Sequence, residues 1–266
     1  MIFKLSLVFF GFLVFIFSAV SQSTGNEEDN FTVKTIASFG DGDGQFNIPH
    51  SLVFDEEGNI YITDTNNNRV QKFSSDGKFI AKWGSNGTGD GQFSNHAHGV
   101  AIDSLDRVYV TDRFNHNIQK FDSDGRFLTK WGSKGSGNGQ FDEPHSSAID
   151  STGNVYVSDM NNRRIQKFSP DGKFIAKWGS KGTGEGQFLL PFGLDFDSHN
   201  NIHVLDRSSG RVQEFFNNGS FISQTLINST DVKGSTSILE DIELDKFDKE
   251  YLTDRANHDI IVILKE

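Results

Sequence analysis

The sequence has no cysteine, and only four of its 266 residues are proline. Disulfides and thiolate metal sites are therefore excluded. Basic charge is also scarce, since 25 Lys and Arg residues stand against 36 Asp and Glu residues and give a formal net charge of −11. Because nucleic acids and anionic membranes attract basic surfaces, this balance argues against either as the main partner.

Long apolar runs are missing except at the N-terminus, where Leu5 to Phe17 is interrupted only by Ser6 and Gly11. Lys4 precedes the run, and Ala19-Val20-Ser21 follows it with small residues where a signal peptidase reads. We therefore expect a signal peptide over 1–21, a flexible lead-in over 22–30 and one folded domain over 31–266. The alternative is an uncleaved N-terminal anchor. Either way, the sequence predicts a secreted or cell-surface protein, which we expect to be a monomer.

Internal repetition dominates the rest of the chain. Gly-Gln-Phe ends at Phe46, Phe93, Phe141 and Phe188, at spacings of 47 or 48 residues. An aspartate after an apolar strand recurs in the same period, at Asp64, Asp112, Asp159, Asp206 and Asp254. Such a period indicates a repeated structural unit.

Each unit divides into four short strands separated by turn residues such as Asn66-Asn67-Asn68 and Asp76-Gly77. No helical pattern competes. Four antiparallel strands per 40–50 residues predict an all-β fold, a β-propeller. Five blades follow by count, with six-bladed closure as the alternative. Because the last unit lacks its fourth strand, we expect Thr32–Phe39 to complete it by pairing with Ile260–Leu264, which would remove the open sheet edges.

The strand-two segment 59–64 (Asn-Ile-Tyr-Ile-Thr-Asp) and the segment 68–73 (Asn-Arg-Val-Gln-Lys-Phe) resemble the NHL repeat. The similarity covers about residues 40–264 and is weakest in the fifth unit. It implies a propeller, often six-bladed in that family. It does not imply one function, because propellers carry unrelated activities.

Histidines gather on one face of the predicted propeller. In an up-and-down meander, the loop before strand one and the turn between strands two and three lie at the same edge. His50, His98 and His145 occupy one repeat phase at the start of strand one, the innermost strand. Three imidazoles converging on the channel mouth could hold Zn²⁺ together with a water. The alternative is a repeated polar position that bonds to a neighbouring blade.

Further polar residues are predicted on the same face. We expect them to form a ligand-binding surface, with the arginines free to hold an anionic group. They are Arg113, His116, Arg207, Arg255 and His258.

Pro-His-Ser after a Gly-Gln-Phe loop is similar to the motif of the peptidyl-hydroxyglycine α-amidating lyase family. This resemblance implies a catalytic zinc ion held by His50, His98 and His145. The sequence departs from that family because Phe192 stands in the fourth repeat where histidine would recur. The family's tyrosine after strand two is also absent, since Thr65, Arg113, Met160, Arg207 and Arg255 occupy those positions.

Two other repeated positions predict structural roles. The recurrent aspartates are expected to accept hydrogen bonds from turn amides and to pair with Arg69, Arg164 and Arg211. Trp83, Trp131 and Trp178 keep one phase and are expected to pack against neighbouring blades.

The sequence thus favours a non-enzymatic binding scaffold for an extracellular ligand or protein. A zinc-dependent lyase using the three channel histidines is the alternative, and a purely structural surface protein is a third. No cofactor other than this zinc ion is expected.

Overall fold

The structure is a computed structural model that describes residues 8–10, 13–18, 32–35, 38–94, 96–227, 239–245, 247–254 and 259–263. In these segments nearly all regular structure is β, and the only helical pieces are two 3₁₀ turns, Thr65–Asn67 (η1) and Arg207–Ser209 (η2). A search of the described residues for a helix of membrane-spanning length and hydropathy finds none. The all-β prediction is confirmed.

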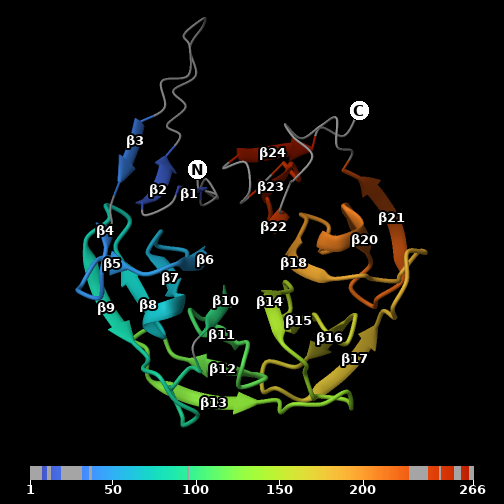
Figure 1. Cartoon of the computed structure of the whole chain (residues 1–266), viewed down its shortest axis with the longest axis horizontal. Helices are drawn as coiled ribbons and strands as arrows, with labels where there is room; N and C mark the ends of the chain where they lie inside the picture. Colours follow the sequence, from blue (N-terminus) through green and yellow to red (C-terminus); the bar gives the residue numbers. More distant parts are fainter. Residues whose placement is uncertain are drawn as a thin grey trace, which may run out of the picture.

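Four complete four-stranded blades follow one another around a ring (Figure 1). In each of them the strands pair antiparallel in chain order, from the innermost strand outward. The first repeat blade comprises β6 (Pro49–Phe54), β7 (Ile60–Asp64), β8 (Arg69–Phe73) and β9 (Phe79–Trp83). The second comprises β10 (Ala97–Ile102), β11 (Val108–Asp112), β12 (Asn117–Phe121) and β13 (Phe127–Trp131). The third comprises β14 (Pro144–Ile149), β15 (Val155–Asp159), β16 (Arg164–Phe168) and β17 (Phe174–Trp178). The fourth comprises β18 (Pro191–Phe196), β19 (Ile202–Asp206), β20 (Arg211–Phe215) and β21 (Phe221–Leu226).

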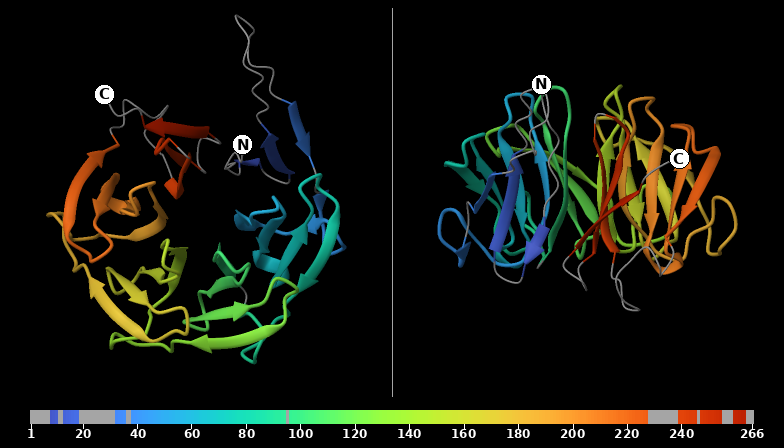
Figure 2. Two further views of the ribbon diagram at one scale, coloured as in Figure 1. Left: turned by 180° about the vertical axis from the view of Figure 1, so that it is seen from behind. Right: turned by 90° about the horizontal axis from the view of Figure 1, so that it is seen from above.

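The fifth repeat blade has three strands, β22 (Leu239–Leu244), β23 (Glu250–Asp254) and β24 (Asp259–Ile263). Five repeat blades are therefore present, as counted from the sequence. A further sheet, made of β1 (Val8–Phe10), β2 (Leu13–Ser18) and β3 (Thr32–Thr35), lies in the ring between the first and fifth repeat blades (Figures 1 and 2).

The predicted closure of the ring is wrong in this structure. Thr32–Thr35 pairs with β2, through Phe15↔Thr35 and Ser18↔Thr32, and the last sheet consists of β22, β23 and β24. The physical reason is proximity along the chain, because joining nearby segments costs less loop entropy than joining the two ends.

Cleavage of residues 1–21 stays a prediction. In the full chain, part of that segment supplies β1 and β2. The two-residue strands β4 (Ser38–Phe39) and β5 (Gln45–Phe46) then lead into the first repeat blade.

The core lies between adjacent blades. In three successive seams, a tyrosine from one blade packs in a cluster with the first strand-two residue of the next blade. These pairs are Tyr61 with Val108, Tyr109 with Val155 and Tyr156 with Ile202. Each seam buries both members fully, so the apolar contacts between blades follow the repeat.

The tryptophans pack across the same seams, as predicted. A Cβ atom on Gly172 would lie 2.6 Å from Cδ2 of Trp131, and the same relation joins Gly125 to Trp83 and Gly219 to Trp178. Each of these glycines lies in a turn of the following blade at positive φ. The indole of one blade therefore packs against a turn of the next blade, at a position where only glycine, which has no Cβ atom, leaves room for the ring.

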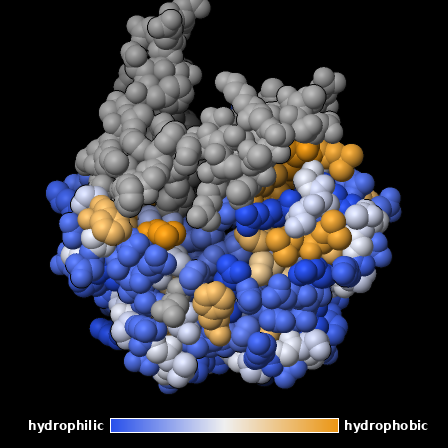
Figure 3. All heavy atoms as spheres, in the orientation of Figure 1, coloured by the Kyte–Doolittle hydropathy of each residue, from blue (hydrophilic) through white to orange (hydrophobic). Residues whose placement is uncertain are grey.

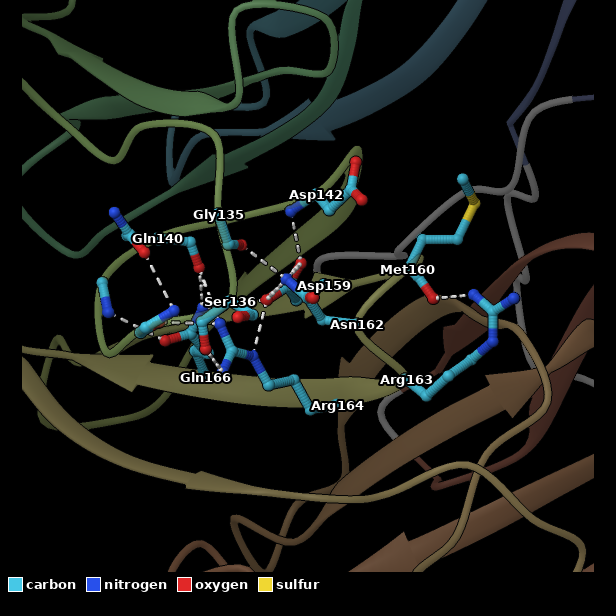
Figure 4. Close-up of polar contacts among 12 residues, drawn as sticks. Gly135, Ser136, Gln140, Asp142, Asp159, Met160, Asn162, Arg163, Arg164 and Gln166 are labelled. Carbon is cyan, nitrogen blue, oxygen red and sulfur yellow. Dashed lines mark hydrogen bonds and ion pairs between the residues drawn. The ribbon is translucent and has the colours of Figure 1, made fainter.

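The recurrent aspartates fasten the Gly-rich connections to the blades. Asp159 accepts hydrogen bonds from the Asp142 amide and the Asn162 side chain, and forms an ion pair with Arg164 (Figure 4). Arg164 in turn donates to the carbonyl groups of Ser136, Gly137 and Gln140. Matching ion pairs join Asp64 to Arg69 and Asp206 to Arg211. The predicted structural role is confirmed for these three aspartates.

Candidate functional site

Five residues at one repeat position surround the axis end of the innermost strands, and we call them the axial tier. In each blade, the first residue of strand one pairs with the aspartate that ends strand two, as Pro49 pairs with Asp64. The tier residue is the next one along strand one. The five are His50, His98, His145, Phe192 and Glu240. In all five blades the register shifts just after this pairing. A β-bulge re-aims side chains, so the same irregularity sets the direction of every tier residue.

The three predicted histidines lie together. The ring centroids are 3.5 Å apart for His50 and His98, 4.1 Å for His98 and His145, and 5.2 Å for His50 and His145. One nitrogen from each ring lies within 4.8 Å of the others. Three successive blades thus bring their imidazoles together on one side of the central axis.

Phe192 and Glu240 complete the tier. The Phe192 ring lies against His145, with centroids 3.6 Å apart. Glu240 Oε2 lies 3.4 Å from His50 Nε2, which connects the fifth repeat blade to the first. Sequence reasoning missed Glu240, although repeat phase would have found it, because its blade is the most degraded of the five.

Burial keeps two of the imidazoles neutral. The pKa values of His98 and His145 lie well below 6.5, first because burial disfavours the charged ring and second because of neighbouring His50. His98 Nδ1 lies 3.2 Å from the His145 carbonyl oxygen. The buried Nδ1 atoms of His50 and His145 have no hydrogen-bond partner among the described residues. Neutral imidazoles with buried, unsatisfied nitrogens fit a metal ion.

Two of the predicted anion-binding arginines, Arg113 and Arg207, have carboxylate partners. Arg113 donates two hydrogen bonds to the same oxygen, Glu143 Oε2, at 3.1 Å from Nε and 2.6 Å from a terminal nitrogen. Arg207 lies 3.5 Å from Glu240 and stacks 4.5 Å over the Phe192 ring. Both guanidinium groups therefore contact carboxylates that the motifs do not show, and binding of an anionic ligand by this face stays a prediction.

His116 has a structural contact. Its Nδ1 accepts a hydrogen bond from the Glu143 amide, and burial lowers its pKa. The last two predicted members of the face, Arg255 and His258, lie outside the described residues.

Beside the tier lies a partly exposed cluster in which the predicted Arg113 contacts Phe114, a residue that the sequence did not single out. The His96 ring lies 6.1 Å from that of His98 and packs edge-on against Phe114 at 4.7 Å. The Arg113 guanidinium lies 5.3 Å from the Phe114 ring centroid. Phe114 keeps 40% of its surface exposed. We call His96, Arg113 and Phe114 the aromatic cluster. The view of one face in Figure 3 shows how apolar patches interrupt a mostly hydrophilic surface.

Comparison with known families identifies the repeat. The NHL repeat model matches three times, over residues 46–73, 95–121 and 141–168. These repeats are NHL repeats.

Two curated relatives of this NHL-repeat propeller share short segments with it. NHL repeat-containing protein 3 of Homo sapiens is 38% identical over 56 residues, which are 21% of this chain and 16% of that protein. Protein lin-41 of Caenorhabditis elegans is 40% identical over 50 residues, 19% of this chain and 4% of that protein. The matches thus span less than a fifth of either relative.

Solved structures show the same fold at low identity. Virginiamycin B lyase from Staphylococcus aureus superposes with a TM-score of 0.60 at 15% identity, over 82% of this chain and 67% of that one. A streptogramin B lyase gives 0.63 at 13%, over 99% and 88%. A chain from a nidogen/laminin complex gives 0.64 at 18%, over 95% and 88%.

Proposed function

We propose that this NHL-repeat propeller is exported and binds a partner protein with the face that carries the axial tier. NHL-repeat propellers are a protein-binding type of scaffold. A chain of similar fold occurs in a nidogen/laminin complex. The acidic composition favours a partner surface without strong negative charge.

The aromatic cluster carries this proposal. Phe114 is exposed, and its ring contacts both the Arg113 guanidinium and the His96 ring. Aromatic and arginine side chains dominate binding energy at protein interfaces when a partner excludes water from them. Ile48, which is 55% exposed and directly precedes β6, adds apolar surface before the innermost strand of the first blade.

Replacing Phe114 tests the proposal. Bound proteins recovered from the protein's native medium should be compared for the wild type, Phe114→Ser and the control Leu105→Ser. Leu105 is 68% exposed and lies in the strand-one to strand-two turn, at the opposite face. A partner lost with Phe114→Ser and kept with Leu105→Ser supports binding at the tier face. Equal retention by both variants contradicts it.

Export has its own test. Cleavage after Ser21 would leave a mature chain that begins at Gln22 and lacks β1 and β2. The N-terminal sequence of the protein collected outside the cell should then start at Gln22. Recovery of an intact Met1 in a membrane fraction would instead support the uncleaved anchor.

A divalent metal ion in the axial tier is the second candidate function. The unsatisfied nitrogens of His50 and His145 favour it. His50, His98 and His145 would be the ligands, and Glu240, 3.4 Å from His50, would orient that ring or add a fourth donor. One neighbouring structure is a virginiamycin B lyase made catalytically inactive by a histidine-to-alanine replacement.

Zinc content tests the second candidate. The wild type should bind one more equivalent than His50→Ala, which removes a partly exposed ligand and leaves the buried pair in place. Phe192→Tyr, altered at the same tier position, should keep that equivalent. The same zinc content in all three proteins would leave the tier as a structural lining of the channel.

A further inference from the structure

The fourth blade departs from the repeat at two positions and the fifth blade at one, and these three positions meet in space. Where other blades have Tyr61, Tyr109 and Tyr156 paired across the ladder with a lysine, this blade has His203 paired with Glu214. Where the following blade would begin strand two with Ile or Val, it has Glu250. The replacements introduce one imidazole and two carboxylates, which are side chains that bind metal ions.

The replacements place charged side chains at one position of a seam that otherwise packs apolar residues, such as Leu205 against Leu252. The three preceding seams bury a tyrosine against an apolar strand-two residue. At the junction of the fourth and fifth blades, His203 Nδ1 lies 2.9 Å from Glu250 Oε1, and both side chains are fully buried. Burying a carboxylate in a seam that is elsewhere apolar is costly without compensating charge.

The other nitrogen of His203 faces two more carboxylates. Nε2 lies 3.5 Å from Asp197 Oδ2 and 4.0 Å from Glu214 Oε1, and one ligand atom from each residue lies within 4.8 Å of the others. Bonds of about 2.0–2.2 Å to a tetrahedral Zn²⁺ place neighbouring ligand atoms about 3.4 Å apart. The spacing therefore suits a shared cation after small side-chain shifts.

Surrounding contacts orient this group as the outer shell of a metal site would. Glu250 can accept the Nδ1 proton of His203, which leaves the Nε2 lone pair directed at the other two carboxylates. Asn201 donates to Asp197 Oδ2, and Ser223 donates to Glu214 Oε2. Both carboxylates are thereby held while an oxygen of each stays near Nε2.

We propose that Asp197, His203 and Glu214 bind a structural divalent transition-metal ion such as Zn²⁺, with Glu250 positioning the imidazole. One imidazole and two carboxylates are donors that Zn²⁺ accepts, and water completes the shell. The site fastens the turn after β18 to β19 and β20. Through Glu250 it also joins the fourth blade to the three-stranded fifth blade.

Restoring the repeat provides the test. In the double variant His203→Tyr/Glu214→Lys, the fourth blade has the Tyr–Lys pair that the third blade holds as Tyr156 and Lys167. The metal-free full chain and this variant are titrated with Co²⁺ and Zn²⁺. The wild type should bind one equivalent more than the variant, whatever the axial tier binds. The additional Co²⁺ should absorb in the visible range, and Zn²⁺ should raise the Tm of the wild type more than that of the variant.

A positioning role for Glu250 has a separate readout. Glu250→Gln keeps a hydrogen-bond acceptor beside Nδ1 but removes the charge, and it should weaken Zn²⁺ binding about 10- to 100-fold without abolishing it. Glu243→Gln, in the neighbouring strand β22, is the control and should leave the affinity unchanged. Equal metal stoichiometry in the wild type and the double variant would overturn the proposal and leave His203 as a buried side chain that only contacts the surrounding carboxylates.

Discussion

The third and fourth blades have nearly the same backbone and different interiors. Strand two pairs with strand three through five residues in both, and both form the Asp–Arg ion pair that holds the Gly-rich connection. At the axis, however, His145 in the third blade is replaced by Phe192 in the fourth, and in the seam Tyr156 is replaced by His203. The hydrogen-bonded frame tolerates such exchanges, so departures from the repeat indicate where this chain has sites of its own.

The largest effect is expected where the frame itself is broken. Gly172→Ala would place a Cβ atom 2.6 Å from Trp131 at a φ of +78°. We expect a loss of about 3 kcal/mol or more in the free energy of unfolding, from clash and backbone strain together. Denaturant unfolding measures it.

Gly153→Ala in the same blade is the matched control. It shares the positive φ but meets only Pro170 Cγ at 3.4 Å, so about 1 kcal/mol is expected. Equal losses in the two variants would show that the indole moves aside and that the seam is not rigid.

A second prediction extends the comparison to the second blade, where Asn117 replaces the arginine that pairs with the aspartate. Burial raises the pKa of Asp112 to about 6, despite hydrogen bonds from Asn115 and Ser94. The folded state binds the Asp112 proton more tightly than the unfolded state does, so protonation of Asp112 stabilises the fold. This contribution is complete below about pH 3.8. It is lost as the pH rises to about 6.

Asn117→Arg should restore the ion pair and lower the Asp112 pKa. Stability at pH 7 should then rise by about 1–2 kcal/mol, and the decline between pH 4 and 6 should flatten. Unfolding curves across this range test both effects, with Asn117→Gln as the uncharged control. An unchanged pH profile in Asn117→Arg would mean that another group titrates there.

A third prediction makes the fourth blade resemble the third at the axis, and its expected effect on stability is as modest as that of Asn117→Arg. Phe192→His should cost about 1–2 kcal/mol, because an imidazole replaces a buried ring of similar shape. The same variant should strengthen Zn²⁺ binding at the axial tier at least tenfold, since it adds a fourth histidine. Calorimetric titration measures the affinity. Unchanged affinity would argue that Phe192 does not face the same space as the three histidines.

Residues that recur at the same position of each repeat allowed much of the structure to be predicted from the sequence. The Gly-Gln-Phe period, the recurrent aspartates and the tryptophans each report one position in a repeated unit, so they predicted the blades, the Asp–Arg pairs and the packing of Trp131. The three histidines share one phase as well, which was enough to place them together near the axis. The phase is harder to recognise where a blade degrades, and Glu240 was missed for this reason, although it keeps the same register.

What the sequence by itself determined is the local pattern: four short strands per repeat, the turns that separate them and the innermost position of His50, His98 and His145. Only the tertiary structure decided which partners those elements take. It paired Thr32–Thr35 with Leu13–Ser18, joined Arg113 to Glu143 and brought His203 of one blade against Glu250 of the next. Strand and turn preferences act over a few neighbouring residues, whereas these contacts join separate segments or blades. Their geometry depends on loop closure and on the register between whole sheets.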